Sequence, residues 1–190
     1  MNRTEKLISD AFWQLLDEKP YNKITVQNIV ERCQVNRNTF YYHFQNIQDL
    51  AECSIQNWAE EQIKANCKFG APVNCIVPIA QEFTKRKRAF VRIYRSSRQD
   101  AFVQCLSEIC VHTVRFYLSS VLDSTELLPE YKEMLVRYYK CTAFGIIMDW
   151  LNAGASYDLI DFCEKICVSF QGAGKSAFLK GRKVSPSFTL

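Results

Sequence analysis

The sequence predicts an all-α protein, and three observations support that prediction. Apolar residues recur at three- and four-residue spacing along nearly the whole chain, which is the period of an amphipathic helix. The apolar-polar alternation that is typical of strands is nearly absent. Proline, glycine and small polar residues stand where these helical segments would begin and end. We therefore expect a series of helices joined by short turns.

The bulk composition is that of an ordinary globular protein. The chain has 190 residues, of which 48% are hydrophobic and 23% are charged. No apolar run approaches the roughly 18 residues that are needed to cross a bilayer. The N-terminal residues also lack the continuous apolar core of a signal peptide. We expect a cytoplasmic protein with no membrane partner.

The first three helices are short and closely spaced. Pro20 ends the first of them, because proline cannot continue a helix. Thr25 and Asn36 are good N-caps for the second and the third, which are separated by a turn at residues 33–35. The third helix is expected to end near Phe44. The apolar face of the first helix consists of Leu7, Ile8, Ala11, Phe12, Leu15 and Leu16.

A fourth helix is expected from Asn46 to about Lys64, and a domain boundary follows it. Asn46 and Asp49 have the spacing of a capping box with Asp in place of Glu. The glycine and the proline at residues 68–72 make the clearest break in the first half of the chain. The predicted units are residues 1–66, residues 67–172 and a disordered tail at residues 173–190.

The second unit is expected to hold five more helices. Pro129 suits the first position of one of them, and Gly154 suits its end. Gly145 lies inside that helix, where glycine costs roughly 1 kcal/mol against alanine unless another helix approaches closely. The five expected segments are residues 74–86, 87–96, 99–121, 129–152 and 158–171.

The nine cysteines are expected to be buried, reduced thiols. No CxxC pair occurs, and only two histidines are present to join a metal site. Cys163 and Cys167 lie one helical turn apart, but no second pair stands near them. We expect no metal and no cofactor, and a thiol-based redox sensor is the alternative that stays open.

Two short helices joined by a tight turn and braced by a preceding amphipathic helix make a helix-turn-helix. In that motif the second helix enters the major groove of DNA. Arg37 and Asn38 stand at the start of this helix, and their side chains fit guanine and adenine. The other predicted DNA contacts carry hydroxyl, amide or ring N–H donors that suit phosphate oxygens, and they are Thr25, Gln27, Thr39, Tyr41, Tyr42 and His43.

This stretch resembles the N-terminal signature of the TetR family of bacterial transcriptional regulators. The signature has an Ile-Thr-Val start, a turn with Val, and then Arg-x-Thr-Phe-Tyr-x-His-Phe. Residues 144–166 are loosely similar to the last two helices of many members. The matching residues of the signature are Ile24, Thr25, Val26, Ile29, Val35, Arg37, Thr39, Phe40, Tyr41, His43, Phe44 and Leu50.

The sequence departs from the family pattern at two positions. Gln34 stands at the turn where many members have glycine, and Ile47 stands where many have a lysine that grips a phosphate. Residues 1–67 carry 7 basic and 9 acidic groups, so the predicted DNA-binding unit is net acidic. These departures predict weaker non-specific DNA binding, since that binding depends on phosphate neutralisation by Lys and Arg.

The resemblance implies a C-terminal domain that binds a small molecule and forms a homodimer. The dimer interface would come from the last two helices, and the effector pocket from the helices before them. Candidate pocket residues are Phe83, Phe90, Tyr94, Phe102, His112, Phe116, Tyr117, Tyr138 and Met148. Candidate interface residues are Phe144, Gly145, Ile147, Leu151, Leu159, Ile166 and Phe170.

These observations predict a transcriptional regulator and not an enzyme. We expect a homodimer that binds a palindromic operator in double-stranded DNA as a repressor and is released by a small-molecule effector. The alternative is a helix-turn-helix coactivator that works through a protein partner.

The basic run at residues 85–98 is either a solvated helix junction or a surface for an acidic partner or the DNA backbone. GAGKS at residues 172–176 is not a phosphate loop, because Ser169 stands where that motif needs glycine.

Overall fold

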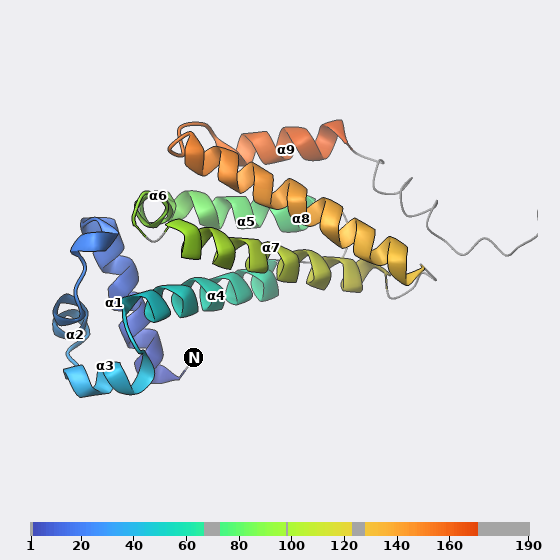
Figure 1. The fold of residues 1–190 in the computed structure, drawn as a ribbon. Coiled ribbons are helices and arrows are strands. Elements are labelled where there is room, and N and C mark those ends of the chain that lie inside the picture. Colours follow the sequence, from blue (N-terminus) through green and yellow to red (C-terminus); the bar gives the residue numbers. More distant parts are fainter. Residues whose placement is uncertain (1, 67–72, 98, 123–127, 171–190) are drawn as a thin grey trace, which may run out of the picture.

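The computed structural model describes residues 2–66, 73–97, 99–122 and 128–170, and helices are the only regular elements in these ranges. The all-α prediction is thereby confirmed for this part of the chain (Figure 1). The predicted boundary at residues 68–72 and the predicted tail at residues 173–190 lie outside the described residues. The elements are α1 Arg3–Glu18, the 3-10 helix η1 Tyr21–Lys23, α2 Val26–Cys33, α3 Arg37–His43, α4 Ile47–Asn66, α5 Val73–Lys85, α6 Lys87–Tyr94, α7 Gln99–Leu122, α8 Pro129–Asn152 and α9 Leu159–Ser169.

The predicted helix caps form as hydrogen bonds. The Thr25 hydroxyl accepts from the Asn28 amide at 3.2 Å, and the Asn36 side chain accepts from the Thr39 amide at 2.7 Å. At the start of α4 the Asn46 side chain accepts from the Asp49 amide at 3.0 Å. The Asp49 carboxylate accepts from the backbone of Gln45 at 2.9 Å, one residue before the predicted cap. These caps fix where α2, α3 and α4 begin.

Gln34 closes the turn between α2 and α3 in the left-handed conformation, with φ of 56° and ψ of 38°. Glycine adopts this conformation without a steric penalty, whereas a residue with a Cβ atom pays roughly 1–2 kcal/mol. The sequence departure from the family pattern therefore falls on a backbone position where glycine would relieve strain.

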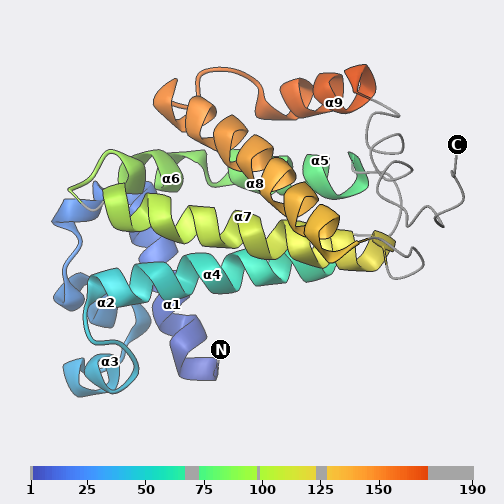
Figure 2. The ribbon, with the colours of Figure 1, turned by 45° about the vertical axis from the view of Figure 1, so that its right-hand side comes forward.

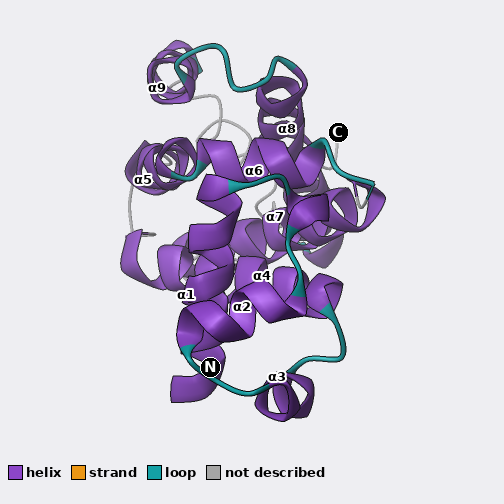
Figure 3. Cartoon of the chain, turned by 90° about the vertical axis from the view of Figure 1, so that its left-hand side faces the viewer, coloured by secondary structure: helices purple, strands orange, loops and turns teal. Residues whose placement is uncertain are grey.

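The helices lie in layers. Figure 2 shows α4 and α7 running side by side, with α8 crossing on the other side of α7. α5 packs against α9, and α6 joins α1 to α7 and α8. Seen from the end of the molecule, α3 and α9 lie on opposite sides, with α1, α2 and α4 between α3 and the rest (Figure 3).

Most of the buried residues form one continuous core that runs from α1 to α9. Its centre is aromatic: the ring centroids of Trp58 and Phe83 are 5.0 Å apart, and those of Phe83 and Phe90 are 4.7 Å apart. A separate small cluster lies between α7 and α8 and consists of Val114, Leu118, Leu135 and Val136. The apolar packing is therefore uninterrupted between the predicted DNA-binding helices and the C-terminal helices.

The prediction of reduced cysteines is wrong at Cys75, which is disulfide-bonded. Spacing along a sequence does not report which thiols meet in the fold. Burial raises the pKa of Cys105 and of Cys110 to about 12, which keeps both thiols protonated at neutral pH.

Among the described residues, no group of three His, Cys, Asp or Glu side chains is placed to hold a metal ion. Over the same ranges, no helix is long and apolar enough to span a bilayer.

Candidate nucleic-acid interface

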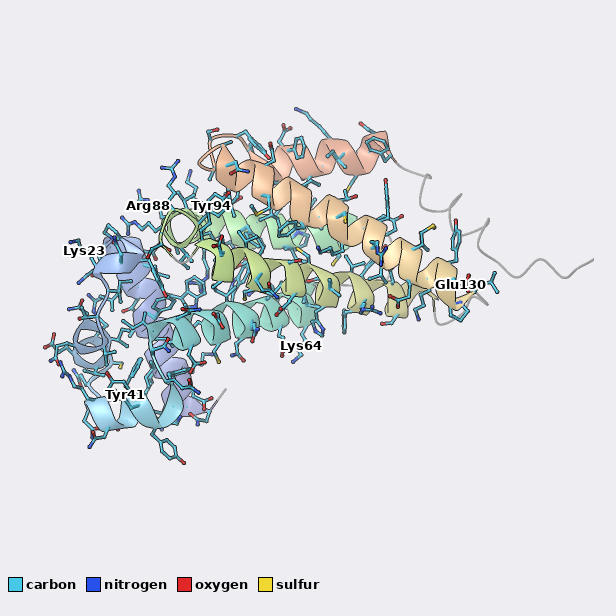
Figure 4. The ribbon with its side chains drawn as sticks, in the orientation of Figure 1. Lys23, Tyr41, Lys64, Arg88, Tyr94 and Glu130 are labelled. Carbon is cyan, nitrogen blue, oxygen red and sulfur yellow. The ribbon has the colours of Figure 1, made fainter. Side chains whose placement is uncertain are left out.

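One face of α3 anchors the helix and leaves the opposite face in solvent. Phe40 is fully buried and Phe44 is 4% exposed, and their ring centroids are 5.9 Å apart. Tyr41 and Tyr42 follow Phe40 around the helix and are 57% and 85% exposed. Figure 4 places Tyr41 at the end of the molecule that α3 forms. Two large rings therefore stand in solvent on a helix whose position is fixed by buried rings.

The first turn of α3 carries exposed Arg37 and Asn38 side chains. The Arg37 Nε donates to Gln27 Oε1 at 3.0 Å, and the Gln27 amide donates in turn to the Glu31 carboxylate. This chain of contacts links α2 to α3 on the exposed side. The terminal guanidinium nitrogens of Arg37 have no ion pair with any described residue, so they remain able to bind an anion or a base edge.

Thr39 and His43 are less accessible than their neighbours. The Thr39 hydroxyl donates to Asn36 Oδ1 at 3.0 Å. His43 Nδ1 lies 3.3 Å from Glu5 Oε1, and the imidazole side chain is 10% exposed. His43 therefore ties the end of α3 to the first turn of α1. The predicted contacts that are exposed together on α2 and α3 are Thr25, Gln27, Arg37, Asn38, Tyr41 and Tyr42.

α1 and α2 are held at a fixed angle by polar contacts that sequence reasoning missed. Arg32 donates to both carboxylate oxygens of Glu18 at 2.7 Å, and Lys19 Nζ donates to Asn28 Oδ1 at 3.2 Å. The Arg32 guanidinium holds the pKa of the Glu18 carboxyl below its ordinary value. The partners lie 14 and 9 residues apart along the chain, so no helical periodicity brings them together in sequence.

A second set of contacts that the sequence does not reveal joins α1 to the C-terminal helices. Arg92 of α6 donates to the backbone carbonyls of Leu16 and Lys19, where α1 ends. The Arg86 guanidinium lies 4.7 Å from the ring centroid of Trp13. Both arginines belong to the basic run that the sequence singles out, but their partners are about 70 residues away. Part of that run is therefore a helix junction.

The predicted pocket residues divide into two sets. Phe83, Phe90, Tyr94 and Phe102 are at most 7% exposed and pack together, and the hollow beside Phe102 holds only about 10 Å³. His112, Phe116 and Tyr138 are exposed, and Met148 and Tyr117 are half-buried. The first set is a filled aromatic core, since about 10 Å³ is close to the space of one water molecule. In the second set, Met148 packs against the edge of that core, whereas Tyr117 packs against the small cluster between α7 and α8.

The predicted interface residues also divide. Leu151 and Leu159 are buried within the chain itself, whereas Phe144, Ile147 and Ile166 are half-buried. Apart from the adjacent residues and the backbone of its own helix, no heavy atom of a described residue lies within 4 Å of a Cβ atom built on Gly145, so this glycine faces open space. Further large apolar side chains are exposed on α8, on α9 and at the residue that follows α9, and they are Met134, Tyr138, Phe162, Val168 and Phe170.

Two family models match the chain. The model for bacterial regulatory proteins of the tetR family matches residues 8–52. The model for a transcriptional regulator C-terminal region matches residues 72–172. The first match covers α1 to α3 and the start of α4, and the second covers α5 to α9.

Similar proteins are regulators of transcription by their names. The HTH-type dhaKLM operon transcriptional activator DhaS of Lactococcus lactis subsp. lactis (strain IL1403) is 33% identical over 66 residues, which is 35% of this chain and 35% of that protein. The match therefore spans about a third of that relative's length.

Solved structures share the fold at lower identity. The dihydroxyacetone kinase operon activator DhaS aligns with a TM-score of 0.74 at 19% identity, over 93% of this chain and 98% of that one. The TetR family repressor AlkX from Dietzia sp. strain DQ12-45-1b aligns with a TM-score of 0.60 at 14% identity, over 90% and 95%. The fatty acid degradation regulator FadR from Bacillus halodurans aligns with a TM-score of 0.54 at 14% identity, over 88% and 94%.

Proposed function

The chain belongs to the TetR family of bacterial regulatory proteins and is a DNA-binding transcriptional regulator, and from this premise we propose how it recognises DNA and responds. The protein acts in the bacterial cytoplasm as a homodimer that binds a palindromic operator. α3 enters the major groove, with Arg37 and Asn38 at the base edges and Tyr41, Tyr42, Gln27 and Thr25 at the flanking backbone.

The exposed face of α3 is the observation that carries this proposal. Tyr42 is 85% exposed although tyrosine usually covers its ring, and Tyr41 stands beside it at 57%. A phenol ring can lie on a thymine methyl while its hydroxyl donates to a phosphate oxygen. We assign His43 a positioning role, since its imidazole is turned to Glu5 and largely covered.

The homodimer forms through α8 and α9 in this proposal. The support is the open space beside Gly145, because a helix without a Cβ atom at that position lets a second helix approach closely. Met134 and Val168 are 49% and 71% exposed on these two helices, and Phe170, the residue after α9, is 66% exposed. A twofold dimer would place two α3 helices in successive major grooves, about 34 Å apart.

We propose that a small, partly apolar effector that carries a hydrogen-bond acceptor releases the operator by entering the aromatic core near α4. The support is a pair of buried polar atoms, Ser54 Oγ and Trp58 Nε1, that have no hydrogen-bond partner among the described residues. These side chains lie one helical turn apart on α4. Since the core is filled, the effector must favour a state in which the helices part. It shifts the population only by its differential affinity for the two states.

The similar proteins include both modes of action, since AlkX is named a repressor and DhaS an activator. We propose that this chain is a repressor. A dimer on an operator that overlaps a promoter excludes the polymerase. A reporter gene placed behind the operator should then be expressed less when the protein is present. Increased expression would overturn repression while leaving DNA recognition in place.

The experiment that tests DNA recognition is selection from a random duplex pool, followed by titration of the selected duplex at several salt concentrations. We expect an enriched palindrome and a salt slope that implies several phosphate contacts. Absence of enrichment, with only weak binding that falls with salt, would overturn the sequence-specific function.

A further inference from the structure

The basic side chains of α5 and α6 fall into two groups. Some have a partner within the fold, and others, called the unused charges below, have none among the described residues. Arg86 and Arg92 contact α1, and Lys85 pairs with Glu82. Lys87 and Arg88, by contrast, are exposed and have no carboxylate partner among the residues that the structure describes. Both cations stand in the first turn of α6, where the positive end of the helix dipole disfavours cations and favours an anion.

These unused charges line a hollow between α6 and the turn that joins α8 to α9. The hollow has a volume of about 210 Å³. Four residues of α6 form one wall, and two residues of the turn form the other. The lining residues are Lys87, Arg88, Val91, Arg92, Gly154 and Ala155.

A further cation stands close to the turn. Gly154 and Ala155 both have positive φ values, of 68° and 57°, which folds the turn back toward α6. A Cβ atom on Gly154 would lie 2.8 Å from Nη2 of Arg95, so the turn backbone sits directly against that guanidinium. Arg95 also has no ion pair among the described residues and adds to the positive potential beside the hollow.

We propose that this hollow binds a small oxyanion, namely phosphate or a phosphate ester. No carboxylate lines it, and guanidinium and ammonium groups are the side chains that bind phosphate best. The volume suits a small ion or ester and is below the usual 300–1,000 Å³ range of pockets for drug-sized ligands. Val91 gives an apolar wall against which the carbon skeleton of an ester can lie.

The hollow is too far from α3 to be a site for the operator backbone. The N-terminal end of α1 meets α3 through Glu5 and His43, and the C-terminal end of α1 meets α6 through Arg92. α1 has 16 residues, which corresponds to a length of about 24 Å. Figures 1 and 3 show α3 and α6 near opposite ends of α1, and Figure 4 shows Arg88 far from Tyr41.

Arg92 connects the hollow to α1, the helix that contacts both α2 and α3. Its guanidinium donates to two α1 carbonyls and also lines the hollow. An oxyanion is a stronger acceptor than a neutral carbonyl, so an occupant competes with α1 for this side chain. Binding of the anion therefore loosens the contact that holds α1 against α6. This coupling rests on the proposed DNA-binding function, whereas the anion site does not.

The anion site is tested by titrating the full chain with inorganic phosphate and pyrophosphate in a calorimeter at constant ionic strength. We expect saturable binding of one anion per chain, and at least tenfold weaker binding to a Lys87→Gln/Arg88→Gln variant. The charge-matched control is Lys132→Gln/Arg137→Gln in the first half of α8, which should bind as the wild type does. Figure 4 places the start of α8, at Glu130, at the opposite end of the molecule from Arg88.

Three results would overturn the site: no saturation at constant ionic strength, equal weakening in both variants, or tighter binding of a polyglutamate peptide than of pyrophosphate. The last would point to an acidic protein partner. The coupling is tested separately by measuring operator affinity with and without pyrophosphate. The coupling predicts that pyrophosphate changes the operator affinity of the wild type and leaves that of Lys87→Gln/Arg88→Gln unchanged. If no operator is found, the proposed function fails while the calorimetric result still decides the site.

Discussion

The face of α3 and the face of α8 and α9 both expose large side chains, but the chemistry of the two faces differs. On α3 the exposed rings are Tyr41 and Tyr42, whose hydroxyls can donate to phosphate. On α8 and α9 the most exposed apolar groups are Val168 and Phe170, which offer water no hydrogen bond. The comparison indicates a polar ligand for the first face and an apolar protein surface for the second.

The two faces also differ in what holds them. α3 has only seven residues, too few for a stable isolated helix, so its position depends on buried Phe40 and on the contact between His43 and Glu5. α8 has 24 residues and is anchored at its end by buried Trp150 and Leu151. Changes in the buried side of α3 should therefore affect stability, and changes in its exposed side should affect DNA binding alone.

Phe40→Ala should produce the largest loss. The side chain is fully buried, and truncation of a buried phenylalanine costs about 3–5 kcal/mol in the free energy of unfolding. Denaturant titration of the chain measures this. Tyr42→Ala is the control on the same helix and should change the free energy of unfolding by less than about 0.5 kcal/mol. Equal losses in the two variants would contradict the assignment of the two sides of α3.

Arg37→Ala should weaken binding to the selected operator by about 1–3 kcal/mol and relax specificity at one base pair. The reason is the loss of a bidentate contact to a base edge. Binding titrations with single-base variants of the operator measure both effects. Arg115→Ala on α7 is the control, since it removes an exposed arginine that pairs with Glu133. A uniform loss over all duplexes would make Arg37 a phosphate contact instead.

Val168→Asp should weaken self-association of the chain at least tenfold. Val168 is 71% exposed on α9, and an aspartate there would lose its hydration when the partner helix covers it. Sedimentation equilibrium measures the dissociation constant. Gln104→Asp, at an exposed position of α7, should associate as the wild type does. A wild type that stays monomeric at all concentrations would contradict the dimer directly.

Gly145→Ala should have small effects of opposite sign. Because open space surrounds this position, alanine should raise the stability of the single chain by about 0.5–1 kcal/mol. The added methyl group should at the same time weaken the dimer if a partner helix approaches here. Unfolding and sedimentation experiments on the same variant separate the two effects. If the alanine variant associates more tightly than the wild type, the partner helix does not approach the chain closely at Gly145.

Local patterns predicted the helix starts and the buried side of α3, because caps and amphipathic spacing act over only a few residues. The cap bonds of Thr25 and Asn36 are examples. The contact between Arg92 and α1 joins residues 76 positions apart, and no local pattern reports it. Spacing also cannot tell a packed aromatic core from a pocket, so the pocket role of Phe83, Phe90 and Phe102 stays a prediction that rests on the resemblance.

The most direct test of the account is the number of chains bound to the selected duplex, measured by sedimentation for the wild type and for Val168→Asp. Recognition by a twofold dimer predicts two wild-type chains per duplex and two half-sites about one helical turn apart. It also predicts much weaker binding by the variant, although the α3 helix of the variant is unchanged. One wild-type chain per duplex, or a monomeric variant that binds as tightly as the wild type, would contradict recognition of DNA by a twofold dimer.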